Sequence, residues 1–162
     1  MGLSFSFCYE DDGPHVDLEG YQGVWYEFAR TPNWFESAYA TDVTASYRLD
    51  ARFRRLTIVN RQLVNGNVIS ATGMGIPINE HNNRLLVTFT PHLPVTSEYR
   101  ILAYEEGVYS LVVSGTWSKH AWVLTRDQSL DPDTFEELKG VLIAHGYPGD
   151  DLQLTTHTLR SC

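Results

Sequence analysis

Short runs of alternating apolar and polar residues dominate the chain from residue 41 to residue 126. In the run 42–49 the odd positions are apolar and the even positions polar, which is the period of a β-strand with one buried face. Clusters such as Asn65-Gly66-Asn67 separate the runs and favour tight turns. Eight such runs at near-regular spacing predict an up-and-down barrel or a sandwich. They are 24–30, 42–49, 55–63, 67–76, 84–90, 98–105, 108–114 and 120–126.

One helix is predicted after the last strand. Asp131 can cap its N-terminus, and Pro132 suits the first helical position. An apolar stripe should face the outside of the strands, and it ends near Gly146. Its members are Phe135, Leu138, Val141 and Leu142. The 162 residues suit one domain, so we expect an N-terminal extension, residues 1–16, and a single domain over residues 17–162.

Two motifs at the ends of this region resemble known signatures. The segment from Asp17 to Arg30, with Gly23-Val24-Trp25 after a short turn, resembles the first signature of the lipocalins. The segment from Trp122 to Arg126 resembles their third signature, a strand that ends in arginine before a lone C-terminal helix. The resemblance runs from Asp17 to Thr156 and points to the branch of the bacterial outer-membrane lipocalin, apolipoprotein D and the plant temperature-induced lipocalins.

This resemblance implies an all-β fold, an eight-stranded antiparallel up-and-down β-barrel with one C-terminal α-helix packed outside. Eight-stranded barrels have room for side chains or for one small ligand, and lipocalins are a known case of the second. Trp25 begins the first strand and Arg126 ends the last, so both fall at the same end of such a barrel. The resemblance implies that Arg126 packs on Trp25 there, as a cation–π contact that closes the barrel.

Strand parity predicts which side chains face the lumen. The inward set is aliphatic and aromatic, and Tyr47, Tyr99 and Trp122 can also donate hydrogen bonds. We therefore expect the lumen to bind and carry or store a fatty acid, a lysophospholipid or a similar amphiphile. A lumen filled by its own aromatic side chains is the alternative. The predicted ligand-binding residues are Val43, Ala45, Tyr47, Leu85, Val87, Phe89, Tyr99, Ile101 and Trp122, and the same alternation turns Ala103 inward.

Composition and motifs exclude several classes of function. Twelve Lys and Arg against twenty Asp and Glu give a formal net charge of −8, which opposes nucleic-acid binding. The six histidines show no metal-ligand spacing, and neither a nucleophile elbow nor a phosphate loop is present. We therefore expect no metal, no cofactor and no catalysis. Two alternatives stay open: a structural or interaction protein of a larger assembly, and a lumen-based isomerase using Glu27, which shares the parity of Trp25.

The ends of the chain leave further questions open. Cys8 and Cys162 are the two cysteines, and they are either free thiols or one terminal disulfide. Gly2 and Ser6 fit the short myristoylation pattern M-G-x-x-x-S. The first residues lack the basic and apolar stretches of a secretory leader, so we expect a cytoplasmic location.

Aromatic and apolar residues gather in the loops expected at the open end of the barrel. They either anchor the rim as a peripheral contact on a membrane or fold inward as a lid. The candidates for such a rim are Trp34, Phe35, Leu93 and Trp117, with Tyr39 in the same loop as the first two.

Overall fold

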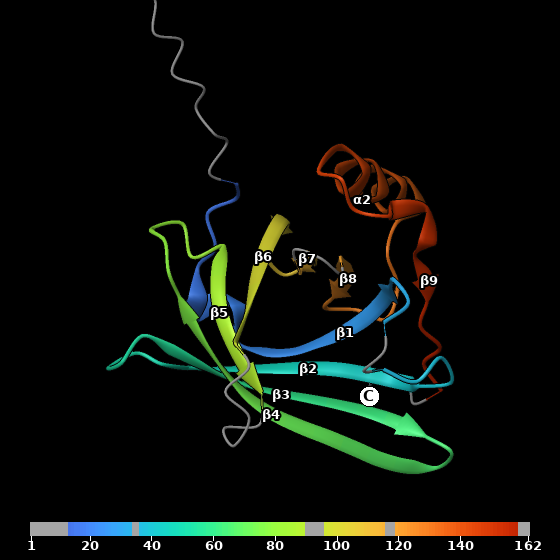
Figure 1. Cartoon of the computed structure of the whole chain (residues 1–162), viewed down its shortest axis with the longest axis horizontal. Coiled ribbons are helices and arrows are strands. Elements are labelled where there is room, and N and C mark those ends of the chain that lie inside the picture. Colours follow the sequence, from blue (N-terminus) through green and yellow to red (C-terminus); the bar gives the residue numbers. More distant parts are fainter. Residues whose placement is uncertain (1–12, 34–35, 90–95, 116–118, 159–162) are drawn as a thin grey trace, which may run out of the picture.

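A computed structural model describes residues 13–33, 36–89, 96–115 and 119–158. Eight antiparallel strands form the predicted up-and-down barrel, in which each strand pairs with the next and β8 pairs with β1 (Figure 1). Their bounds differ from the predicted ones by at most two residues. They are β1 (Gly23–Arg30), β2 (Thr41–Asp50), β3 (Arg55–Val64), β4 (Asn67–Pro77), β5 (Arg84–Phe89), β6 (Thr96–Glu105), β7 (Tyr109–Ser114) and β8 (His120–Thr125).

Local turn chemistry accounts for the longest hairpin, between β3 and β4. Asn65 and Gly66 both have positive φ, 51° and 79°. Two consecutive residues of this kind fit a two-residue hairpin loop whose twist matches that of the strands. The ladder therefore begins directly beside the turn, with Val64 opposite Asn67, and runs to Leu56 opposite Gly75.

The predicted helix, α2 (Pro132–Ala144), lies outside the barrel (Figure 1). Asp131 caps it by accepting a hydrogen bond from the Thr134 amide at 3.2 Å. Leu138 and Leu142 of the predicted stripe are buried. They pack on the outer faces of the strands, in one cluster with Ala29, Leu102, Leu111, Val113, Ala121 and Val123.

One prediction of strand parity is wrong. Ala103 packs in the outer cluster under α2, whereas Ile101 is buried inside the barrel. The ladder between β6 and β7 shifts register between Ile101 and Ala103. An extra residue at such a bulge reverses the alternation beyond it.

Three short elements were not predicted from the sequence: α1 (Leu18–Tyr21), the 3-10 helix η1 (Gly149–Asp151) and β9 (Gln153–Leu154). The α1 helix precedes β1, and its buried Leu18 and Tyr21 pack among residues of the barrel interior. Val16, just before it, is also fully buried. The β9 strand pairs with Ala29 and Arg30, at the part of β1 that lies beyond its ladder with β2.

Candidate ligand-binding site

The end of the barrel at the start of β1 is closed by Trp25 and Arg126. The Arg126 guanidinium carbon lies 3.8 Å from the centroid of the Trp25 ring. The same guanidinium donates hydrogen bonds to the carbonyl oxygens of Gly20, Gln22 and Val24 at 2.7–2.9 Å. The Trp25 indole donates to the Tyr21 carbonyl at 2.9 Å. Arg126 thus ties α1, β1 and β8 together beneath a fully buried tryptophan.

Above this seal, aromatic rings pack together at the closed end of the barrel. Tyr21 packs against Trp25, Tyr47 and Tyr104, with ring centroids 4.8–5.7 Å apart. The Tyr21 and Ser110 hydroxyls share a 2.8 Å hydrogen bond. Burial raises the pKa of Tyr21 and of Tyr47 well above the usual tyrosine value. Tyr47, a predicted ligand contact, therefore belongs to this packed closed end.

The middle of the lumen wall is aliphatic. Leu85 and Val87 on β5 are buried together with Leu56 and Ile58 on β3, and Phe89 and Tyr99 pack against them. Val43 and Ala45 on β2 are also buried, each with 8 % of its surface exposed. On β4 the two buried positions are glycines, Gly73 and Gly75, and a Cβ on Gly73 would stand 2.6 Å from the Phe89 ring. Glycine there lets that ring lie against the β4 backbone.

Toward the other end, an aromatic pair marks the change from apolar to polar lining. The rings of Tyr99 on β6 and Trp122 on β8 meet edge to face with centroids 5.6 Å apart. The Trp122 indole donates a 2.9 Å hydrogen bond to Oε1 of Glu36, in the loop between β1 and β2. Burial, and then the negative charge of Glu36, raise the pKa of Tyr99 to about 12. Of the two predicted ligand residues, Trp122 thus binds a carboxylate at the open end, and Tyr99 packs on Trp122.

A bulge in β1 brings two further charged groups to this carboxylate. The ladder with β8 shifts register between Glu27 and Ala29. Residues three apart on a regular strand face opposite sides, whereas one extra residue puts Glu27 and Arg30 on the same side. Arg30 Nη1 lies 2.6 Å from Glu27 Oε1 and 3.4 Å from Glu36 Oε2. The three side chains are only 3–11 % exposed, and we call them the mouth cluster.

Neighbouring segments hold the mouth cluster in place. Thr155, which follows β9, donates to Glu27 Oε1 at 2.7 Å, and the Ser37 carbonyl accepts from Arg30 Nη2 at 2.8 Å. The Asn33 side chain accepts from the Glu36 amide at 2.8 Å, a local turn that fixes the loop. The cluster is therefore built by the first loop and the C-terminal segment as well as by the barrel.

The charges of the cluster do not balance. Burial, and then the negative charge of Glu36, raise the pKa of Glu27 to about 8, against the lowering effects of Arg30 and Thr155. Parity with Trp25 identified Glu27 from the sequence. Arg30 and Glu36 were not predicted from the sequence. A bulge reverses the side of the strand to which Arg30 points, and Glu36 lies in a loop, where no periodic pattern indicates direction.

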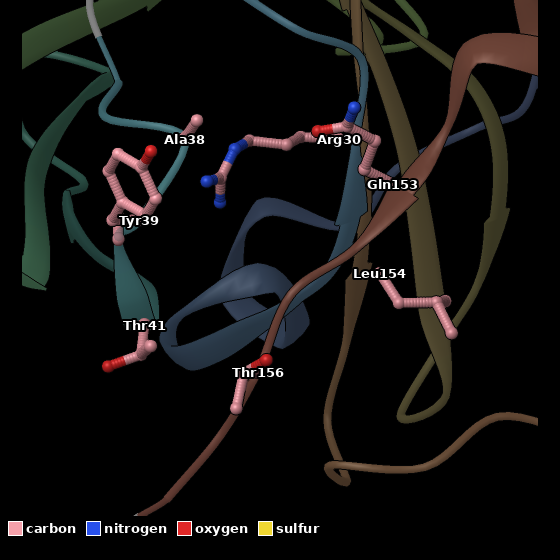
Figure 2. A pocket seen from close by; sticks show the side chains of 8 residues that line it. Arg30, Ala38, Tyr39, Thr41, Gln153, Leu154 and Thr156 are labelled. Carbon is pink, nitrogen blue, oxygen red and sulfur yellow. The ribbon is translucent and has the colours of Figure 1, made fainter.

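A surface pocket of about 300 Å³ adjoins the cluster on the side of β9. Figure 2 shows the Arg30 guanidinium reaching toward Ala38 and Tyr39 across it. Thr41, Gln153, Leu154 and Thr156 form the rest of the wall that the figure labels. Arg30 therefore belongs both to the mouth cluster and to the wall of this pocket.

Several predictions fall on residues that the structure does not describe. Trp34, Phe35, Leu93, Trp117, Cys8 and Cys162 all lie outside the described residues. Tyr39, from the same loop as the first two, is described and is 83 % exposed. Within the described residues, no three His, Cys, Asp or Glu side chains are grouped so that they could hold a metal ion. No helix in those parts of the chain has the length and apolarity needed to cross a membrane.

The chain matches the family model of the lipocalin-like domain over residues 16–157. Protein R877 of Acanthamoeba polyphaga mimivirus, named as a lipocalin, is 30 % identical over 85 % of this chain and 82 % of its own length. Temperature-induced lipocalin-1 of Arabidopsis thaliana is 24 % identical, covering 86 % and 78 %. Apolipoprotein D of Bos taurus is 29 % identical, covering 87 % and 77 %.

Solved structures agree on the fold. Insecticyanin from the tobacco hornworm Manduca sexta superposes with a TM-score of 0.73 at 18 % identity, covering 92 % of this chain and 88 % of that one. The relatives match the branch indicated by the two sequence motifs, from viral, plant and animal sources. The chain belongs to the lipocalin family.

Proposed function

We propose that this lipocalin binds and carries or stores a fatty acid, a lysophospholipid or a similar amphiphile in its lumen. Members of the family are in general binders or carriers of small hydrophobic molecules. The observation that supports the proposal is the polarity gradient inside the barrel. One end is sealed by aromatic rings, the middle is aliphatic, and charged groups occur at the open end. An amphiphile with its chain inward and its polar head at the mouth matches this order.

The expected affinity suits a carrier. Burying about fourteen methylenes at about 0.8 kcal/mol each contributes roughly 11 kcal/mol before costs. Ordering the acyl chain of the ligand and restricting its translation cost several kcal/mol, which leaves a Kd around micromolar.

Native mass spectrometry of the purified protein tests this proposal. We expect the protein to retain lipid of host origin, and Val43→Trp, which places an indole at an inward position of β2, to lose it. Val24→Trp is the matched control, because Val24 is 48 % exposed on the outside of β1. Thermal unfolding verifies that both variants fold. A wild type that carries no lipid and takes up none on incubation would contradict the carrier role and favour a structural protein with a filled lumen.

A lumen-based isomerase is the second candidate. The raised pKa of Glu27 favours it, because a carboxylic acid that keeps its proton near neutral pH can act as a general acid. Against it, Glu27 Oε1 already accepts from Arg30 and Thr155. Turnover of a bound lipid by wild type, lost in Glu27→Gln, would identify this activity.

We also infer that the open end touches a bilayer when lipid enters or leaves. The support is the sequence of the loops with Trp34, Phe35, Leu93 and Trp117, together with the exposure of Tyr39. Interfacial aromatic side chains favour the boundary between water and hydrocarbon.

A further inference from the structure

The mouth cluster contains two carboxylates for one guanidinium. Glu27 and Glu36 both contact Arg30 Nη1, and all three side chains are almost fully buried. Counting formal charges, the cluster has one uncompensated negative charge when both carboxylates are ionised. An uncompensated buried charge is costly, so the site gains from any positive charge that enters it.

The guanidinium of Arg30 is already engaged by the protein. Nη1 donates to Glu27, at 2.6 Å, and Nη2 donates to the Ser37 carbonyl at 2.8 Å. Nη1 also lies 3.4 Å from Thr155 Oγ1. An anionic head group would approach two carboxylates to reach this one cation. The cluster therefore disfavours a carboxylate head.

Glu36 has a carboxylate oxygen that could accept a hydrogen bond from a cationic head group. Its Oε1 accepts from the Trp122 indole at 2.9 Å and lies 3.3 Å from the Asn33 amide nitrogen. Its Oε2 is buried and, among the described residues, accepts no hydrogen bond, with only the 3.4 Å ion pair to Arg30 beside it. An acceptor oxygen with spare capacity thus lies at the open end of the apolar lumen.

An aromatic group, reached through Trp122, lies next to the Glu36 carboxylate. Trp122 holds Glu36 directly, Tyr99 meets Trp122 edge to face, and the His120 ring lies 6.2 Å from that of Trp122. A carboxylate attracts an ammonium group by charge, and an aromatic ring close to it can add a cation–π contact to the same group.

We propose that the open end of the lumen recognises the ammonium group of a cationic or zwitterionic amphiphile, with Glu36 as its counter-charge. The proposal rests on the lumen binding an amphiphile and names the head group. It favours lipids with an amine head, such as lysophospholipids that carry ethanolamine or choline, over free fatty acids.

The state of Glu27 supports the same conclusion. Its pKa is raised to about 8 because burial and Glu36 outweigh Arg30, which favours the protonated form near neutral pH. A ligand cation in the cluster would favour the ionised form instead. The surrounding titratable groups are Tyr99 on β6, His120 on β8 and His157, whose Nε2 lies 2.7 Å from the Glu27 carbonyl oxygen. Binding of an ammonium should therefore release protons from the protein.

Matched ligands with one chain length test the proposal. Isothermal titration calorimetry on the delipidated full chain would compare dodecylamine and dodecanoate below their micelle concentrations with dodecanol below its solubility limit. We expect dodecylamine to bind at least tenfold more tightly than dodecanoate, with dodecanol between them. Titrations in two buffers of different ionisation enthalpy should show proton release with dodecylamine and none with dodecanol.

Two variants test whether Glu36 causes the preference for dodecylamine. Glu36→Gln keeps the size of the side chain and one acceptor oxygen for Trp122, and it should weaken dodecylamine about tenfold while leaving dodecanol within threefold. Glu137→Gln removes the same charge from the exposed surface of α2 and should change neither. Equal binding of dodecylamine and dodecanoate by wild type overturns the proposal even if Glu36→Gln does not fold. Absence of binding by all three ligands contradicts the proposed lipid-binding function itself.

Discussion

Trp25 and Arg126 are a hundred residues apart in sequence and share one contact. The guanidinium stacks on the indole at 3.8 Å and also satisfies three carbonyl oxygens of the α1–β1 segment. A partly desolvated cation–π contact contributes about 0.5–2 kcal/mol. Each residue therefore stabilises the barrel partly through the other.

A double-mutant cycle measures this dependence. We expect Arg126→Ala to lower the unfolding free energy by about 1–3 kcal/mol and Trp25→Ala by about 3–5 kcal/mol. The double variant should lose about 0.5–2 kcal/mol less than the sum, because the second substitution has no partner left to remove. Urea unfolding of the four proteins gives the three differences. Strict additivity would show that the stacking carries no energy.

Glu27 makes stability depend on pH in an unusual direction. Its folded pKa of about 8 lies above the ordinary value of about 4.3 expected in the unfolded chain. Between these values the folded protein binds more protons, so this group's contribution to stability is fully present below about pH 4 and is lost as the pH rises through 8. Arg30 and Thr155 donate to its carboxylate, Glu36 acts on it through its charge, and His157 lies at its backbone carbonyl oxygen.

The comparison of wild type with Glu27→Gln isolates that contribution. From pH 5 to pH 9 we expect wild type to lose about 1–4 kcal/mol of unfolding free energy relative to the variant. Chemical unfolding at each pH measures it, and Glu105→Gln, an exposed carboxylate on β6, serves as the control. Parallel profiles for wild type and Glu27→Gln would mean that Glu27 titrates alike in the folded and unfolded chain.

At the scale of elements, the sequence predicts what depends on local periodicity. The predicted bounds of the eight strands and α2 lie within two residues of the observed ones. The signals used, which are alternation, turn residues and the Asp131-Pro132 helix start, depend only on residues close in sequence. The two motifs then supplied the closure of the barrel, since alternation alone is equally compatible with a sandwich.

The bulges in β1 and β6 and the short strand β9 could not be predicted from local patterns. The shifts at Ile101–Ala103 and at Glu27–Ala29 depend on how neighbouring strands pair, and no single-strand pattern records that. The β9 strand has only two residues. It pairs with the part of β1 that extends beyond β2, where the backbone N–H and C=O groups would otherwise lack a strand partner. The mouth cluster combines a bulge, a loop and this C-terminal segment, which is why only Glu27 was a candidate beforehand.

At the scale of the molecule, the two ends of the barrel are built for different tasks. The closed end joins α1, β1 and β8 through Trp25 and Arg126 and contains packed rings. The open end holds buried charges whose partners come from the first loop and the C-terminal segment. Under the proposed carrier function, closure at one end therefore leaves the other end for the exchange of ligand.

Exchange at the open end raises the question of how an apolar chain avoids water. With a formal net charge of −8, the protein gains no general attraction to anionic lipid, so attachment must come from apolar side chains. Trp34, Leu93 and Trp117 follow β1, β5 and β7 in the sequence and lie outside the described residues. If these side chains anchor the rim, lipid can pass directly between bilayer and lumen.

Flotation with neutral phosphatidylcholine liposomes tests the rim. We expect wild type to float and the triple variant Trp34→Ser, Leu93→Ser, Trp117→Ser to stay at the bottom of the gradient, since interfacial aromatics supply most of such binding. The control is Ile76→Ser with Leu86→Ser, which removes exposed apolar side chains from the barrel wall and should float. If the triple variant floats as wild type does, or wild type never floats, these residues cover the lumen as a lid and lipid must reach it through water.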